Sequence, residues 1–212
     1  AEIEDIYRPF RPKRKTRASV AKERGLEPLA ALIAEMRESY DDTLEVIAEA
    51  YVDEEKGVEN AKAALDGACD IIAESVSDNA DFRRDIRALT FDNGTISSVK
   101  SGEGDSVYEI YYDFCEKLKS VPSHRILAMN RGEKEDILKV SVNVDSDIIL
   151  NYLFANVITN YKSPAFRYMA RAICDGYDRL IAPSIEREIR STLFDNASES
   201  AIKLFSENLK NL

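Results

Sequence analysis

The stretch Gly57–Asp78, "GVENAKAALDGACDIIAESVSD", decides the fold class of this 212-residue chain. Its apolar side chains recur every three or four residues, which is the period of an amphipathic α-helix with one buried stripe. The stripe consists of Val58, Ala61, Ala64, Leu65, Ala68, Ile71, Ile72 and Val76. Because several of these residues are alanine, neighbouring elements can pack closely against the stripe. The sequence therefore predicts a long helix inside a helical body.

Helical patterns of the same kind lie on both sides of this stretch. Thr16 and Asp145 are predicted N-caps, and Gly25 is the predicted end of the first short helix. Further helices are predicted over 26–38, 43–51, 79–91 and 123–132, from Asp145, from Ser163-Pro164, and from Pro183 towards the C-terminus. We expect a break between the last two helices near residues 181–183. In the last helix we expect these apolar residues to face inward: Ile185, Ile189, Leu193, Ala197, Ile202, Phe205 and Leu209.

Two short segments predict β-structure instead. "TISSVK", residues 95–100, is typical of a brief strand, and in "ILKVSVNV", residues 137–144, valines alternate with polar residues at the period of a half-buried strand. The two segments are expected to pair, and a two-stranded ribbon needs helices to pack against. The predicted fold is mainly α: a multihelical body with a minor two-stranded β element.

Composition excludes several classes of protein. No apolar run approaches the ~20 residues that a membrane-spanning helix needs, so we expect no membrane partner. The N-terminus has no apolar signal-peptide stretch, and the odd number of cysteines, three, argues against a disulfide framework, which favours a reducing cytoplasm. The first residue is Ala rather than Met, so we expect a segment of a longer protein.

The sequence contains no pattern typical of catalysis. His124 is the only histidine, so any Ser–His–Asp or Cys–His arrangement would have to use it, and its place at a predicted helix start favours a local hydrogen-bonding role. One histidine and scattered cysteines do not supply four zinc ligands, and no glycine-rich phosphate loop is present. We expect neither enzymatic activity, nor a metal, nor a cofactor.

Positive charge is concentrated near the start of a chain whose net charge is −10. Within ten residues the chain carries six basic side chains, which we call the basic arm: Arg8, Arg11, Lys13, Arg14, Lys15 and Arg17. Pro9 and Pro12 favour an extended backbone there. Such a strip suits a nucleic-acid backbone, and six phosphate contacts would lose roughly 10³-fold in affinity between 50 and 200 mM salt. The alternative is ion pairing with the carboxylates of residues 25–212, which carry a net charge of −14.

Several stretches together resemble the bacterial Tex family of transcription accessory proteins. They are "EDIYRPFRPKRKTRASVAKERGLEPLA", "GVENAKAALDGACDIIAE", "VPSHRILAMNRGEKEDIL", "YDRLIAPSIEREIRSTL" and "AIKLFSENLKNL", which extend over essentially the whole chain. The resemblance implies a helical region that precedes a nuclease-like domain, helix-hairpin-helix modules and an S1 domain. No catalytic or binding residue carries over, because the matched stretches contain no functional motif of the family.

From the residues and the resemblance together we expect one multihelical region. Its parts would be the basic arm with short helices over 1–25, a first lobe over 26–120 and a second lobe over 121–212. The first functional hypothesis is a non-enzymatic scaffold that adds RNA or DNA backbone contacts through the basic arm. The second is a docking module for the transcription machinery without direct nucleic-acid contact.

Overall fold

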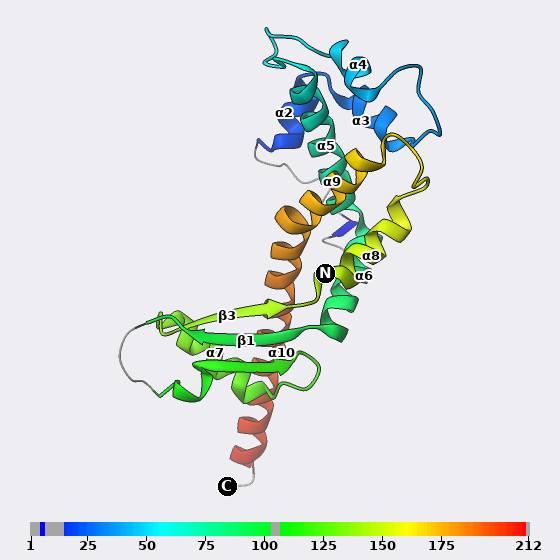
Figure 1. The fold of residues 1–212 in the computed structure, drawn as a ribbon. Helices are drawn as coiled ribbons and strands as arrows, with labels where there is room; N and C mark the ends of the chain where they lie inside the picture. The colour runs from blue at the N-terminus through cyan, green and yellow to red at the C-terminus, as the bar shows by residue number, and fades with distance from the viewer. Residues whose placement is uncertain (1–4, 7–14, 103–106, 211–212) are drawn as a thin grey trace. The chain divides into compact units, whose positions relative to one another are not determined.

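The computed structural model describes residues 5–6, 15–102 and 107–210, and within this part the protein is mainly helical (Figure 1). It divides into two compact units, each made of two stretches of chain. The first unit comprises residues 1–84 and 149–183, and the second comprises residues 85–148 and 184–212. The lobe boundary predicted near residue 120 lies inside the second unit.

The first unit is a group of helices around α5 (Ala61–Asp78). The helices α2 (Arg17–Glu23), α3 (Glu27–Ala34), α4 (Leu44–Glu49) and α9 (Phe166–Gly176) all pack against α5. The unit also contains the start of α6 (Ala80–Asn93) and most of α8 (Ser146–Val157). The predicted stripe is the reason for this arrangement, because Ala64, Leu65, Ala68 and Ile72 are all buried.

Close packing between α5 and α9 depends on one glycine. A Cβ atom placed on Gly176 would lie 3.0 Å from the carbonyl oxygen of Ala73, so a larger residue would force the two helices apart. The small residues Ala73 and Gly176 therefore allow the backbones of α5 and α9 to approach closely, as the alanine-rich stripe predicted.

The predicted ends of the first short helix are confirmed, whereas the helix predicted over 26–38 ends earlier, at Ala34. The Thr16 hydroxyl accepts a hydrogen bond from the backbone N–H of Ser19, and the Ser19 hydroxyl accepts one from the N–H of Thr16, so both side chains satisfy free donors at the start of α2. Gly25 follows α2 with φ of 81°, a conformation that glycine adopts without a steric penalty. Both ends of α2 are therefore determined by residues that lie next to them in the sequence.

The second unit contains a three-stranded antiparallel sheet in the order β2-β1-β3, with β1 (Thr95–Lys100), β2 (Asp113–Lys117) and β3 (Leu138–Asn143). The predicted pairing of the first and last strands is confirmed, with Ser97 opposite Ser141. The expectation of a two-stranded element was wrong, because the sheet has a third strand, β2. The missed strand, "DFCEK", has no apolar alternation beyond the half-buried Phe114, because it is an exposed edge.

Helices α7 (Ser123–Lys134) and α10 (Ala182–Lys210) contribute side chains to the sheet face that carries Ile96 and Val140. The short 3₁₀ turn η2 (Glu109–Tyr111) precedes β2. Ile126 and Met129 of α7 are buried, and so is Ile189 of α10. The core of this unit therefore lies between one face of the sheet and these two helices.

The expected break near residues 181–183 is wrong. After α9, the chain forms a π turn, η3 (Tyr177–Ile181), and continues directly into α10. Pro183 lacks a backbone N–H, and its ring would clash with a carbonyl in a regular α-helix. The wider π turn, in which the N–H of Ala182 donates to the carbonyl of Tyr177, accommodates the proline without ending the helix.

The inward face predicted for the last helix is only half correct. Ile185 and Ile189 are buried, whereas Ile202 and Phe205 are 69% and 65% exposed. Leu209 has no described side chain. In the part of the chain that is described, no helix combines the length and the apolar character that crossing a bilayer would require.

Candidate functional site

The basic arm lies mostly outside the described residues. Of its six cations, Arg8, Arg11, Lys13 and Arg14 fall in the undescribed stretch 7–14, while Lys15 and Arg17 are described and exposed. Lys15 Nζ lies 3.5 Å from a carboxylate oxygen of Glu23, and both side chains are well exposed, so this ion pair contributes little stability. Lys15 therefore keeps its charge available to a ligand.

Thr16 connects the end of the basic arm to the central helix of the first unit. Besides capping α2, its hydroxyl donates a hydrogen bond of 3.1 Å to a carboxylate oxygen of Glu74 on α5. The two cations that flank Thr16 are thus held at a fixed place on the folded unit.

Arg17 borders a shallow hollow of about 260 Å³ that contains several ionised side chains. Its other charged lining residues are Asp66, Asp70, Arg171 and Asp175. Arg171 lies 2.7 Å from Asp66, and the guanidinium of Arg179 bridges Asp70 and Asp175 at 3.2 and 2.6 Å. Three arginines therefore meet three aspartates, and this side of the basic arm carries no surplus positive charge.

Burial and charge oppose each other in this hollow. Burial raises the pKa of Asp70 above its ordinary value, and the nearby Arg179 and Arg17 guanidinium groups partly offset this effect. Burial also raises the pKa of the Cys69 thiol, although Arg171 acts in the opposite direction. The thiol is therefore protonated at neutral pH and is a poor nucleophile.

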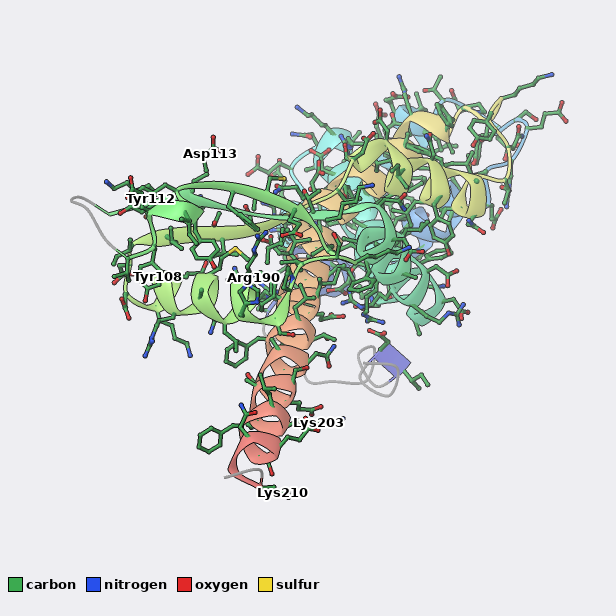
Figure 2. All side chains as sticks on the ribbon, turned by 90° about the horizontal axis from the view of Figure 1, so that it is seen from below. Tyr108, Tyr112, Asp113, Arg190, Lys203 and Lys210 are labelled. Carbon is green, nitrogen blue, oxygen red and sulfur yellow. The ribbon has the colours of Figure 1, made fainter. Side chains whose placement is uncertain are left out.

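A second group of charged side chains lies along the outer edge of β3 in the second unit. The backbone N–H of Val140 donates to a carboxylate oxygen of Glu133 at 3.1 Å, and that of Val142 donates to Glu186 at 3.0 Å. Arg190, which Figure 2 labels, donates to the carbonyl oxygen of Val140 and also pairs with Glu133. Side chains of α7 and α10 thus occupy backbone groups that would otherwise be free to bind another strand.

Sequence reasoning missed this group. Glu186 and Arg190 of α10 are half-buried and contact the backbone of β3, although nothing in the predicted inward face of this helix indicated it. The available signal was spacing: Glu186 and Arg190 are four residues apart, which places them on one side of a helix.

His124 is exposed at the start of α7. Within residues 5–6, 15–102 and 107–210, no three His, Cys, Asp or Glu side chains come together as potential metal ligands.

Comparison with known proteins identifies relatives along the full length of the chain. The chain is 49% identical over 215 residues to "Uncharacterized protein YdcI" of Bacillus subtilis, and the alignment covers 100% of this chain and 30% of that protein. It is 32% identical to "Transcriptional accessory protein Tex" of Neisseria gonorrhoeae, over 99% of this chain and 28% of that protein. The human "S1 RNA-binding domain-containing protein 1" is 26% identical to the chain, over 100% of this chain and 22% of that protein.

The chain thus spans less than a third of the length of these relatives. Residues 31–205 match the family described as Tex central region-like. This match begins within α3 and ends within α10, and it therefore includes most helices of the first unit and the sheet of the second. The resemblance identified from short stretches of sequence is confirmed, and the chain belongs to the Tex central region-like family.

Proposed function

We propose that this chain is a non-enzymatic helical scaffold within a longer, cytoplasmic, Tex-like transcription accessory protein, and that its basic arm contacts an RNA or DNA backbone. The observation that supports the proposal is the placement of the arm. Six cations lie within ten residues that end at the first residue of α2, and Thr16 joins the end of that stretch to α5. No catalytic step, metal or cofactor is part of the proposal.

Electrostatics would determine how such a contact behaves. Residues 25–212 carry a net charge of −14, so most of the chain repels phosphate whereas the arm attracts it. Binding would consequently be weak, independent of base sequence and steeply dependent on salt. The names of two relatives, one a transcriptional accessory protein and one an S1 RNA-binding domain-containing protein, agree with such a role.

The test is a fluorescence anisotropy titration of a labelled single-stranded RNA at 50 and 200 mM salt. We expect binding at 50 mM that weakens by roughly 10³-fold at 200 mM if all six cations meet phosphates. A variant with Lys13, Arg14, Lys15 and Arg17 changed to Glu should lose this binding, and DNA is then tested in the same way.

A matched variant controls for total charge. Lys62, Lys139, Lys162 and Lys203 are exposed lysines outside the basic arm, and changing all four to Glu alters the net charge by the same amount. This control should keep its affinity to within about threefold. Equal loss in both variants, or no binding by the wild type at 50 mM salt, would contradict the proposal.

The second candidate function is protein docking without nucleic-acid contact. Its specific support is the hollow beside Arg17, where arginine charges are already balanced by Asp66, Asp70 and Asp175. In this case the arm would pair with the chain's own carboxylates, and acidic helices would meet a basic partner of the transcription machinery. The quadruple arm variant would then lower the melting temperature more than the matched control does, while neither protein binds RNA.

A further inference from the structure

The second unit contains a cleft of about 350 Å³ that plays no part in the proposed function. It lies between the sheet, α7 and α10. Its floor is aliphatic and consists of Ile96, Ile126, Met129 and Val140, with Leu193 and Phe194 as one wall. This volume lies at the lower end of the range for small-ligand pockets and is enough for one or two apolar side chains.

All charged residues that line the cleft are cations: Lys134, Arg187 and Arg190. Arg190 is engaged by Glu133 and by the carbonyl of Val140. Lys134 Nζ lies 5.4 Å from the ring centre of Phe194, and Arg187 is exposed. Among the described residues, no carboxylate forms an ion pair with Lys134 or with Arg187. The rim therefore carries positive charge that is not neutralised, in a chain of net charge −10.

The apolar wall of the cleft continues along α10. Ala201 and Phe205 follow Phe194 by seven and eleven residues, so they lie on the same side of the helix. Phe205 is 65% exposed and the neighbouring Ile202 is 69% exposed. The strip from Phe194 to Phe205 is roughly 16 Å long; Phe194 is half-buried and Ala197 is buried, and the strip is uncovered from Ala201 to Phe205. An exposed apolar strip that joins an apolar cleft is a feature of interaction surfaces.

We propose that this cleft and strip bind a peptide segment of a partner protein that presents apolar side chains next to carboxylates. Apolar anchors would enter the aliphatic floor and lie along α10, while Asp or Glu side chains of the peptide would pair with Arg187 and Lys134. Burial of apolar surface would supply affinity, and the two cations would set the orientation and exclude basic peptides.

A nucleic-acid strand fits this surface less well. The floor is aliphatic, and one face of Phe194 is covered by the Lys134 ammonium, so the ring has less surface available for base stacking. The backbone groups of Val140 that could read a base edge are already bound to Glu133 and Arg190. Charge complementarity and shape thus favour an acidic, amphipathic peptide.

The experiment is a selection of peptides from a phage-displayed library of random 12-residue peptides, with the whole 212-residue chain immobilised. We expect enriched peptides to combine Leu, Ile, Phe or Met with nearby Asp or Glu. The best peptide is then synthesised with a fluorescent label and titrated by anisotropy against the wild type and three variants.

The variants separate the cleft from the rest of the surface. Arg187→Glu should weaken binding at least tenfold, and Phe205→Ala should weaken it about threefold or more. Lys203→Glu should leave it within twofold, because Lys203 follows Phe194 by nine residues and lies on the opposite side of α10 (Figure 2). Arg187→Glu and Lys203→Glu alter exposed side chains and change the net charge equally, so their affinities can be compared directly. Unchanged circular dichroism spectra would show that both variants retain the fold.

Four results would overturn the inference. Three are the absence of any enriched sequence family, enrichment of basic peptides, and binding that Arg187→Glu leaves unchanged. A fourth is binding of a labelled single-stranded RNA that Arg187→Glu abolishes while the arm variant retains it, since the cleft would then be a nucleic-acid site.

Discussion

The two ends of α10 carry the same kind of apolar pattern but have opposite surroundings. Ile185 and Ile189, near its start, are 1% and 3% exposed, whereas Ile202 and Phe205, near its end, are 69% and 65% exposed. The first pair meets the other elements of the folded chain. The second pair faces solvent in the described structure.

This difference shows what an amphipathic pattern does and does not specify. The period of apolar residues selects one side of a helix, but it contains no information about what covers that side. The covered end stabilises the fold, and the uncovered end is available to a partner. If this distinction is correct, equivalent substitutions at the two ends should differ sharply in their effect on stability and on binding.

The largest expected effect is the contrast between Ile189→Ala and Phe205→Ala. Loss of the buried Ile189 side chain should lower the free energy of unfolding by about 2–4 kcal/mol, through lost burial and the cavity that remains. Phe205→Ala should change it by less than about 0.5 kcal/mol, because the ring is largely exposed already. Urea unfolding followed by circular dichroism measures both values, and similar losses at the two positions would contradict the comparison.

A smaller effect is expected where α7 and α10 cover the edge of β3. Glu133→Ala removes the acceptor of the Val140 N–H and the carboxylate partner of Arg190, which should cost about 1–3 kcal/mol. Glu207→Ala, on the exposed last turns of α10, serves as the control and should cost less than about 0.5 kcal/mol. Glu133→Gln should recover part of the loss, since its amide oxygen can still accept the backbone bond. If Glu133→Ala unfolds at the same urea concentration as the wild type, this edge contact contributes no stability.

The smallest effect concerns an exposed carboxylate of the first unit. A hydrogen bond of 2.5 Å from the Tyr168 hydroxyl, followed by a backbone hydrogen bond and the charge of Arg167, lowers the pKa of Glu45 from its ordinary value of 4.5. A lowered pKa means that the stabilisation is complete above pH 4.5 and disappears as the pH falls through the folded-state value. Because the side chain is 48% exposed, we expect less than about 1 kcal/mol at pH 7.

The measurement compares wild type with Glu45→Gln in urea unfolding at pH 7, 5, 4 and 3. The difference between their free energies of unfolding should be constant between pH 7 and 5 and should shrink below pH 4.5. A difference that grows as the pH falls would show that burial, rather than the tyrosine hydrogen bond, dominates at Glu45.

Local features of the chain were predictable from sequence to a considerable extent. The caps at Thr16 and Asp145 and the glycine stop at residue 25 lie where they were predicted, since each depends on bonds within a few residues. The pairing of β1 with β3 was predictable because alternating valines specify one buried face. The strand β2 was not, because an edge strand with one half-buried phenylalanine carries almost no pattern.

The candidate site was less predictable than the fold. Composition located the basic arm, but the balance of charge around Arg17 depends on aspartates of α5 and α9 that are about 50 to 160 residues away. The cationic cleft was not predicted at all, because its rim combines α7 with α10. Arg83 is a further example: it is fully buried and pairs with Asp5, 78 residues earlier, although nothing in its neighbourhood distinguishes it from an exposed arginine.

The sequence by itself determined the mainly helical class, the positions of most helices, the first and last strands and the family. These properties depend on residue periods, caps and short matched stretches, which are local in the chain. Only the tertiary structure decided which apolar faces are covered, how Pro183 is accommodated in a continuous helix, and which charges meet. These outcomes depend on segments that are far apart in sequence, and burial and ion pairing arise only when folding brings such segments into contact.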